Sequence, residues 1–368
     1  MAQVSSVRSA LLIAGAFIAF LVGSGFATGQ EIMQYFVGYG YAGVLGAGIV
    51  FAVFVYVGLS FVSAGHHQQF QKGNDVYAHY CGKYVGRFYD YFSVVFIYMS
   101  FMVMVGGAGA TLHQQYDLPV HYGGIGIAVV AGVTVLFGLS NIVNVIGAIA
   151  PVICVGTILL GVAGMLLNPS GLASADEAIA GMDLLRASPH WLSAAMSYVG
   201  FCMLWLAAFM SQIGKNARTG REARLGAVLG AFGFSLAVVV ITLGLMANID
   251  LVAGSLVPSL ALAGKLHPLI GTLFSLAVYA AIYTTAVPLL WLVVARVVPD
   301  DKSRAFKTAT VLLAAAGTLI ALQVPFDRLI NIVYVLNGYV GICLLAFMLI
   351  KDITGTALPG LLRRLLPA

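Results

Sequence analysis

The stretch that decides the fold is Val22-Gly23-Ser24-Gly25-Phe26-Ala27-Thr28-Gly29-Gln30-Glu31, in the middle of the first long apolar run, residues 11–36. Roughly 20 apolar residues suffice to cross a bilayer as a helix, so this run predicts a membrane helix. Three glycines within seven residues, followed by a Gln-Glu pair, are unfavourable in a continuous lipid-facing helix. We therefore expect the helix to break at Gly23 to Gly25, inside the membrane.

A break at this depth predicts a ligand site. The backbone N–H and C=O groups that it frees are tolerated in a membrane only where protein or a water-filled cavity surrounds them. The second half-helix would offer its free N–H groups to an anion, and the first half would offer carbonyls to a cation.

The composition is that of a polytopic membrane protein. Of 368 residues, 61% are hydrophobic, 8% are charged and 43 are glycines, so most of the chain must lie in lipid. The basic residues fall in short loops without interleaved aromatic residues, so we expect a lipid bilayer and a small molecule as partners, and no nucleic acid. The four cysteines lack metal-ligand spacing, and no nucleotide-binding or hydrolase motif is present. We therefore expect neither an enzyme nor a bound organic cofactor.

Ten apolar runs follow one another, which predicts ten transmembrane helices in a single domain covering residues 1–368. The runs are residues 11–36, 41–62, 88–112, 122–139, 142–167, 191–213, 223–249, 269–298, 305–323 and 329–350. We expect no cleavable signal peptide, because the first run is too long for the apolar region of one.

The runs divide into two halves of five, which we interpret as an inverted repeat. The expected bounds are about 8–167 for repeat one, about 190–350 for repeat two and 351–368 for a short cytoplasmic tail. In each half a long loop follows the second run, at 63–87 and at 250–268. The second half also opens with a glycine-containing run, so we expect a second break within residues 196–202, and paired broken helices mark a site near the midplane. The alternative is that glycines in both runs only allow close helix packing.

The basic residues indicate the orientation of the chain. If the N-terminus is cytoplasmic, 15 of the 18 Lys and Arg residues lie inside: Arg8, Lys72, Lys83, Arg87, Lys215, Arg218, Arg221, Arg224, Arg296, Lys302, Arg304, Lys307, Lys351, Arg363 and Arg364. Arg186, Lys265 and Arg328 lie outside. The positive-inside rule thus predicts a multi-pass protein of the bacterial cytoplasmic (inner) membrane with both termini in the cytoplasm.

Two motifs carry a resemblance to a known family. Gly23-Ser24-Gly25 resembles the Gly-Ser-Gly turn of the amino acid–polyamine–organocation transporter superfamily, and the string from Gly23 through Glu31 to Phe36 is similar to the YkvI-like bacterial membrane proteins. The resemblance implies the LeuT-type fold, an all-α membrane protein of ten helices in a 5+5 inverted repeat with helices 1 and 6 broken. It also implies an ion-coupled secondary transporter that works by alternating access.

The expected substrate site combines the two predicted breaks. Gly23, Ser24 and Gly25 would bind the carboxylate of a small zwitterionic solute, an amino acid or a related amine. The second break would complete the pocket with Tyr198, Gly200 and Phe201.

The eighth run suggests a site for a coupling cation. The adjacent hydroxyls of Thr284 and Thr285 and the carbonyl of Ala281 could supply three oxygens to a small hard cation. The resemblance implies a sodium site here, completed by the carbonyls of Ala19 and Val22. The alternative is that the two threonines bond back to their own helix.

Glu31 is the acidic residue placed well inside an apolar run. A charged carboxylate at the bilayer centre costs roughly 2.5–3.5 kcal/mol on insertion scales, so it must be protonated, paired or in contact with water. Glu31 could couple transport to protons in place of sodium, contact the amine of a substrate, or hold the core together. The family motif usually lacks this residue, so the resemblance implies no role for it.

Two functions from different classes fit the sequence. The first is an ion-coupled symporter of a small organic solute; the second is a sensor or receptor that keeps the transporter fold and binds a solute without moving it. The sequence leaves the oligomeric state and the identity of the substrate open.

The charge asymmetry makes a testable prediction about topology. Because 15 cations fall on one side, a reporter fused after Ala368 should behave as cytoplasmic. A green fluorescent fusion should therefore fluoresce and an alkaline phosphatase fusion should be inactive. Active phosphatase at this position would contradict the predicted orientation.

Overall fold

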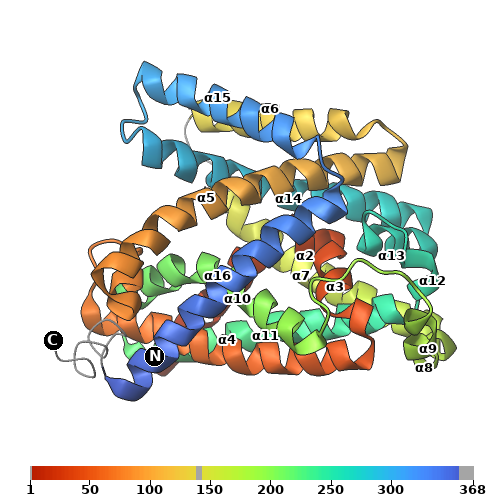
Figure 1. The fold of residues 1–368 in the computed structure, drawn as a ribbon, viewed down its shortest axis with the longest axis horizontal. Coiled ribbons are helices and arrows are strands. Elements are labelled where there is room, and N and C mark those ends of the chain that lie inside the picture. The colour runs from red at the N-terminus through yellow and green to blue at the C-terminus, as the bar shows by residue number, and fades with distance from the viewer. Residues whose placement is uncertain (1, 138–142, 356–368) are drawn as a thin grey trace.

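The computed structural model describes residues 2–137 and 143–355, and the regular structure in these ranges is helical (Figure 1). In the described ranges, eight helical segments are long and apolar enough to cross a membrane. Two shorter apolar helices, Val7–Leu21 and Val152–Leu167, lie in the first and fifth predicted runs. The chain is therefore an all-helical, multi-pass membrane protein, and the count of ten spans stays a prediction.

The first helix is interrupted twice, which confirms the predicted break. Helix α1 (Ala2–Leu21) ends before Gly23, whose backbone is extended, and α2 (Ser24–Thr28) begins after it. Gly29 then takes the left-handed conformation, with φ of 80°, before α3 (Gln30–Tyr35). A side chain at this position would be strained, and a Cβ atom there would lie 2.5 Å from the hydroxyl of Ser259, so only glycine fits. Gly25 itself lies inside α2.

The remaining elements follow in chain order. They are the short 3₁₀ helix η1 (Val37–Tyr39) and the helices α4 (Tyr41–Gln68), α5 (Asp75–Tyr116), α6 (Val120–Phe137), α7 (Val143–Leu167), α8 (Pro169–Ala173), α9 (Ala175–Ala180), α10 (Trp191–Asn216), α11 (Gly220–Met246), α12 (Ile249–Val252), α13 (Pro258–Leu266), α14 (Pro268–Val297), α15 (Arg304–Ala321) and α16 (Phe326–Thr354). Several begin at standard signals, such as the Thr219 hydroxyl that accepts from Glu222 N–H at 3.2 Å, and Pro268 in the first turn of α14.

The two long loops predicted after the second runs are wrong in the structure. Helix α4 extends to Gln68 and α5 begins at Asp75, with a kink at Gly82, so only 69–74 connects them. Residues 250–268 contain most of α12 and all of α13. Hydropathy marks only the apolar part of a helix, and these helices continue into polar sequence. The predicted tail, 351–368, overlaps the end of α16 at Thr354, and residues 356–368 of the tail lie outside the described ranges. Residues 138–142, where the fourth predicted run ends and the fifth begins, also lie outside them.

The predicted break in the sixth run is also wrong. Helix α10 continues without interruption through residues 196–202. A single glycine weakens a helix by only about 1 kcal/mol relative to alanine, and the stretch contains no proline. Gly200 instead permits a close crossing: a Cβ atom at Gly200 would lie 2.0 Å from the carbonyl oxygen of Gly338 in α16. The packing alternative is thus the correct one for this glycine.

The helices form two groups joined by α7 and α16. Helices α1, α4, α10 and α11 pack on one another, while α5, α6, α14 and α15 form the second group, with α6 and α15 side by side on its outer face (Figure 1). Helix α7 contacts α1, α11 and α14, and α16 contacts α10 and α5. The short α2 packs on α5 and α14, so the interrupted helix lies between the groups.

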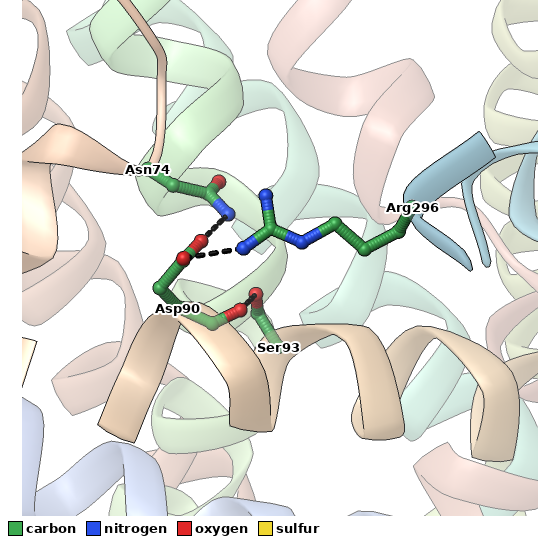
Figure 2. A network of polar contacts seen from close by, with 4 residues as sticks. All are labelled: Asn74, Asp90, Ser93 and Arg296. Atoms are coloured by element: carbon green, nitrogen blue, oxygen red, sulfur yellow. Dashed lines mark hydrogen bonds and ion pairs between the residues drawn. The ribbon is translucent and has the colours of Figure 1, made fainter. Parts of the chain in front are cut away.

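Cations of the predicted inside set meet at one end of the molecule. Lys215 Nζ donates to the Phe70 carbonyl at 2.6 Å, and Lys351 Nζ donates to the His79 carbonyl at 2.5 Å. Arg296, at the end of α14, pairs with Asp90 of α5. Figure 2 shows that the Asp90 carboxylate also accepts from the Asn74 side chain, at 2.6 Å, so this network ties the connection before α5 to α14.

Two cations of the predicted outside set lie at the other end. Arg186 Nε donates to the Gly38 carbonyl at 2.7 Å, beside the start of α4, and Lys265 Nζ donates to Asn248 Oδ1 at 3.0 Å, beyond the end of α11. These five cations are separated as the charge pattern requires. Which end faces the cytoplasm stays a prediction.

Candidate functional site

A buried carboxylate lies where the interrupted helix meets α10 and α16. Glu31, in the first turn of α3, is 2% exposed, and its Oε1 accepts a hydrogen bond from the Tyr198 hydroxyl at 2.9 Å. A Cβ atom at Gly25 would lie 2.3 Å from Glu31 Oε2 and 2.9 Å from Cε2 of Tyr334. Segments α2, α3, α10 and α16 therefore converge on one carboxyl group.

Among the described residues, no positively charged side chain pairs with this carboxylate. The ion pair found in residues 2–137 and 143–355 is the distant one between Arg296 and Asp90. No Lys, Arg or His is among the buried residues of these ranges. Acidic side chains are almost never fully buried without a partner. Glu31 therefore needs a proton or a cation from outside the chain.

Seven aromatic rings in mutual contact adjoin the site through Tyr198 and Tyr334. Tyr198 lies at its centre, with ring centroids 5.3 Å from Tyr35, 4.9 Å from Phe36 and 5.1 Å from Phe201. The remaining three rings complete the shell: Phe54 is 6.4 Å from Tyr198, Tyr334 stacks on Phe201 at 4.5 Å, and Trp205 is 5.6 Å from Tyr334. We call these seven rings the aromatic shell.

Several buried polar atoms on the segments that meet at the carboxylate make no well-formed hydrogen bond within the described residues. They are the hydroxyls of Tyr35, Tyr334 and Ser197, the indole N–H of Trp205 and the side-chain oxygen of Asn337. Buried polar atoms in native proteins are nearly always paired, and each exception needs an explanation. Five such atoms on helices that converge at a buried carboxylate favour a binding site there, where a ligand supplies the missing partners.

The structure brings some of the predicted substrate residues together and separates others. Tyr198 and Gly25 both contact Glu31, and Phe201 lies in the aromatic shell. Ser24 is fully buried, and its hydroxyl donates weakly to the Val103 carbonyl at 3.5 Å. Gly23 packs against the methyl carbon of Met104. Gly200 lies at the crossing with α16.

Sequence reasoning missed the contribution of the tenth run. Tyr334 and Asn337 are fully buried polar residues on α16, three positions apart. A tyrosine and an asparagine one helical turn apart within an apolar run were the available signal. Nothing local relates the tenth run to the first, so this pair does not by itself indicate a contact with Glu31.

The predicted cation residues lie on α14 and at the end of α1. The hydroxyls of Thr284 and Thr285 both donate to the Ala281 carbonyl, at 2.9 and 3.0 Å, as the alternative interpretation expected. The break does free the other two carbonyls. Gly23 N–H donates to Leu21 instead of Ala19, and the first backbone bond after the break is that from Ala27 N–H to Gly23, so the helical bond from Phe26 N–H to the Val22 carbonyl is not made. Two hydroxyls and three carbonyls are all oxygen ligands, which fit a hard cation. The described residues contain no group of three His, Cys, Asp or Glu that could hold a metal ion.

Two cavities open at opposite ends of the molecule. One cavity, of about 210 Å³, is lined by Gln30, Met33 and Gln34 of α3, by Asp183 and Asp327, and by residues 184–185 and 253–256. We call it the outer cavity because it lies at the end that is predicted to face outward. The cavity at the other end, of about 430 Å³, is lined by parts of α4 and α5 and by Asp352. Glu31 is next to Gln30 in sequence, so the outer cavity approaches the site along α3.

Comparison with known proteins agrees with this architecture. No protein-family model matches the chain. The chain is 23% identical over 355 residues to the uncharacterized membrane protein YkvI of Bacillus subtilis, covering 94% of this chain and 97% of YkvI. It is 26% identical over 228 residues to the uncharacterized protein YyaD of the same organism, covering 61% of this chain and 62% of YyaD.

Similar solved structures identify the fold. MhsT in complex with L-phenylalanine gives a TM-score of 0.60 at 16% identity, covering 92% of this chain and 88% of MhsT. Mhp1, a nucleobase-cation-symport-1 family transporter, gives 0.59 at 15% identity, covering 88% of this chain and 74% of Mhp1. These neighbours are LeuT-fold membrane transporters and not enzymes. The chain thus has the LeuT-type fold that its first run suggested.

The two tyrosines of the site should respond differently to loss of the hydroxyl. Tyr198→Phe leaves an oxygen of a buried carboxyl group without its donor and should lower the free energy of unfolding by about 1–3 kcal/mol. Tyr334→Phe removes a buried hydroxyl that makes no well-formed hydrogen bond and should destabilise the protein clearly less than Tyr198→Phe. Thermal unfolding of the purified, ligand-free variants measures both. Equal destabilisation by the two changes would contradict the hydrogen-bond assignment.

Proposed function

We propose that this protein is an ion-coupled secondary transporter that moves a small organic solute, an amino acid or a related amine, by alternating access. The observation that carries the proposal is the buried cluster of Glu31, Gly25 and unpaired polar atoms between cavities at opposite ends. Such a site at the break of a membrane helix is the arrangement that secondary transporters use.

The packing supports a 5+5 repeat. If α1 to α7 and α10 to α16 are two repeats of five spans, α1 corresponds to α10, α4 to α11, α5 to α14, α6 to α15 and α7 to α16. Exchanging the repeats turns the α1–α11 contact into the α10–α4 contact, and the α7–α14 contact into the α16–α5 contact. Both members of each pair are present, as a pseudo-two-fold axis requires.

The ligands of the structural neighbours agree with a small organic substrate. MhsT was solved with L-phenylalanine and Mhp1 with bromovinylhydantoin, two compact ring-bearing molecules. For this chain we propose a contact set of Ser24, Gly25, Tyr198 and Phe201, with Gly23 shaping the break. Gly200 would contribute only through the close approach of α16.

We propose the bacterial inner membrane as the location, with both termini in the cytoplasm. The single-ended cluster of basic residues, which includes Lys215, Lys351 and Arg296, supports this orientation.

Transport and the role of the break can be tested together. Solute counterflow in proteoliposomes separates a transporter from a receptor, because a receptor binds without exchange. Gly25→Val should abolish counterflow, since its side chain would displace Glu31 and Tyr334, whereas Ser24→Ala should weaken substrate affinity by only about 0.5–1.5 kcal/mol. Size-exclusion chromatography checks folding. Normal substrate affinity in a folded Gly25→Val variant would place the substrate elsewhere, and binding without counterflow would favour the receptor.

We propose sodium as the coupling ion, bound by Ala19, Val22, Ala281, Thr284 and Thr285. The carbonyls that the break frees support this, and the threonine hydroxyls would turn from Ala281 toward the cation. Protons acting through Glu31 are the alternative.

Substrate affinity in sodium and in potassium decides between the two ions. Replacing Thr284 and Thr285 together by alanine should abolish the sodium dependence of substrate affinity and leave the fold intact, because two of five oxygens are lost. Thr310→Ala on α15, whose hydroxyl likewise bonds back to its own helix, is the matched control. Equal affinity in sodium and potassium for the unchanged protein would contradict sodium coupling and favour protons.

A further inference from the structure

The Glu31 carboxylate occupies the place where a solute carboxylate would have to bind. Its Oε2 lies against the Cα atom of Gly25, at the start of α2. A second carboxylate at this position would meet a like charge at contact distance, which is strongly unfavourable in a buried site. The predicted carboxylate site is therefore already filled by a side chain of the protein.

Little else near the break attracts an anion. Helix α2 has five residues, and a macrodipole is the sum over aligned peptide groups, so its N-terminus carries only a small fraction of the usual field. No Lys, Arg or His is buried in the described ranges to balance the charge of a bound anion. The electrostatics of the site thus disfavour a substrate carboxylate.

The same environment favours a cation. The faces of aromatic rings carry negative potential, and a ring over an organic cation contributes about 0.5–2 kcal/mol, more when water is excluded. Of the aromatic shell, Tyr198 contacts Glu31 through its hydroxyl, and the ring of Tyr334 lies against Gly25, beside the carboxylate. An ammonium group would gain a carboxylate whose hydrogen bond comes from the neutral Tyr198 hydroxyl and that has no positively charged partner among the described residues, together with contact with the neighbouring aromatic rings.

The outer cavity has matching charge. Its lining contains the carboxylates of Asp183 and Asp327 and includes no Lys, Arg or His. The nearby Arg186 is outside the lining and is bound to the Gly38 carbonyl. A concave surface with one sign of charge raises the local concentration of the opposite ion. A cationic solute would therefore collect at the end of α3, close to Glu31.

We infer that the substrate is an organic cation without a carboxylate, an amine or quaternary ammonium compound whose positive charge pairs with Glu31 inside the aromatic shell. This inference rests on the proposed transport function and narrows its substrate class. Glu31 takes the place of the carboxylate that an amino acid would bring with it.

Matched pairs of compounds test the inference. The pairs are choline and glycine betaine, cadaverine and lysine, and phenethylamine and phenylalanine, which share a cationic group and differ in the carboxylate. Binding to the purified full-length protein is measured by thermal stabilisation and by titration calorimetry. In at least one pair, the compound without a carboxylate should bind at least tenfold more tightly than its partner.

The variants assign the preference to Glu31. Glu31→Gln should weaken binding of the preferred cation at least tenfold and reduce its advantage over the carboxylate-bearing partner. Glu31→Asp, which keeps the charge on a shorter side chain, should bind the cation more weakly but retain the preference, and it serves if the glutamine variant does not fold. Glu222→Gln changes another buried acidic residue, on α11, and should leave binding unchanged.

The outcomes separate this inference from the proposed function. Tighter binding of the carboxylate-bearing member of every binding pair, or an unchanged preference in folded Glu31→Gln protein, would overturn the inference. Counterflow of an amino acid would then still support a transporter. Binding of neither member of any pair would overturn the assignment of an organic cation, and the absence of counterflow for any bound solute would contradict the transport function itself.

Discussion

The site depends on the interruption of the first membrane helix between Leu21 and Gln30. In one continuous helix, Gly25 and Glu31 would be separated by about 9 Å along the axis and by about 120° around it, so the carboxylate could not lie against the glycine. The left-handed turn at Gly29 changes the direction of the chain and brings the two together. Only glycine takes this conformation without strain, and Ser259 leaves no space for a Cβ atom.

Once Glu31 is buried there, the surrounding helices are arranged to accommodate it. Tyr198 from α10 donates to it, and Tyr334 from α16 lies beside it, against the same face of Gly25. The unpaired hydroxyls and the absence of a buried cation in the described ranges are unfavourable for stability, since each unsatisfied buried polar group costs about 1–3 kcal/mol. Natural proteins depart from local rules mainly at functional sites, and here the departures coincide with the break.

Glycine has two separate functions in this chain, and sequence spacing does not distinguish them. Gly29 supplies a backbone conformation, whereas Gly200 and Gly341 allow α10 and α16 to cross with their backbones in contact. Both kinds occur in mid-membrane runs beside aromatic and small residues. The break predicted in the sixth run was wrong for this reason: the glycine there meets another helix, and the information about that contact lies 138 positions away, at Gly338.

The sequence by itself determined the membrane class, the positions of the apolar runs and the break in the first helix, because length, hydropathy and glycine content act locally. It also singled out Glu31, because a carboxylate in an apolar run is costly wherever it lies. Only the tertiary structure decided that Tyr198 donates to Glu31, that Tyr334 closes the site and that Thr284 and Thr285 bond back to Ala281. These contacts depend on which helix faces are brought together, and no local pattern specifies the partner of a buried polar group 167 positions away.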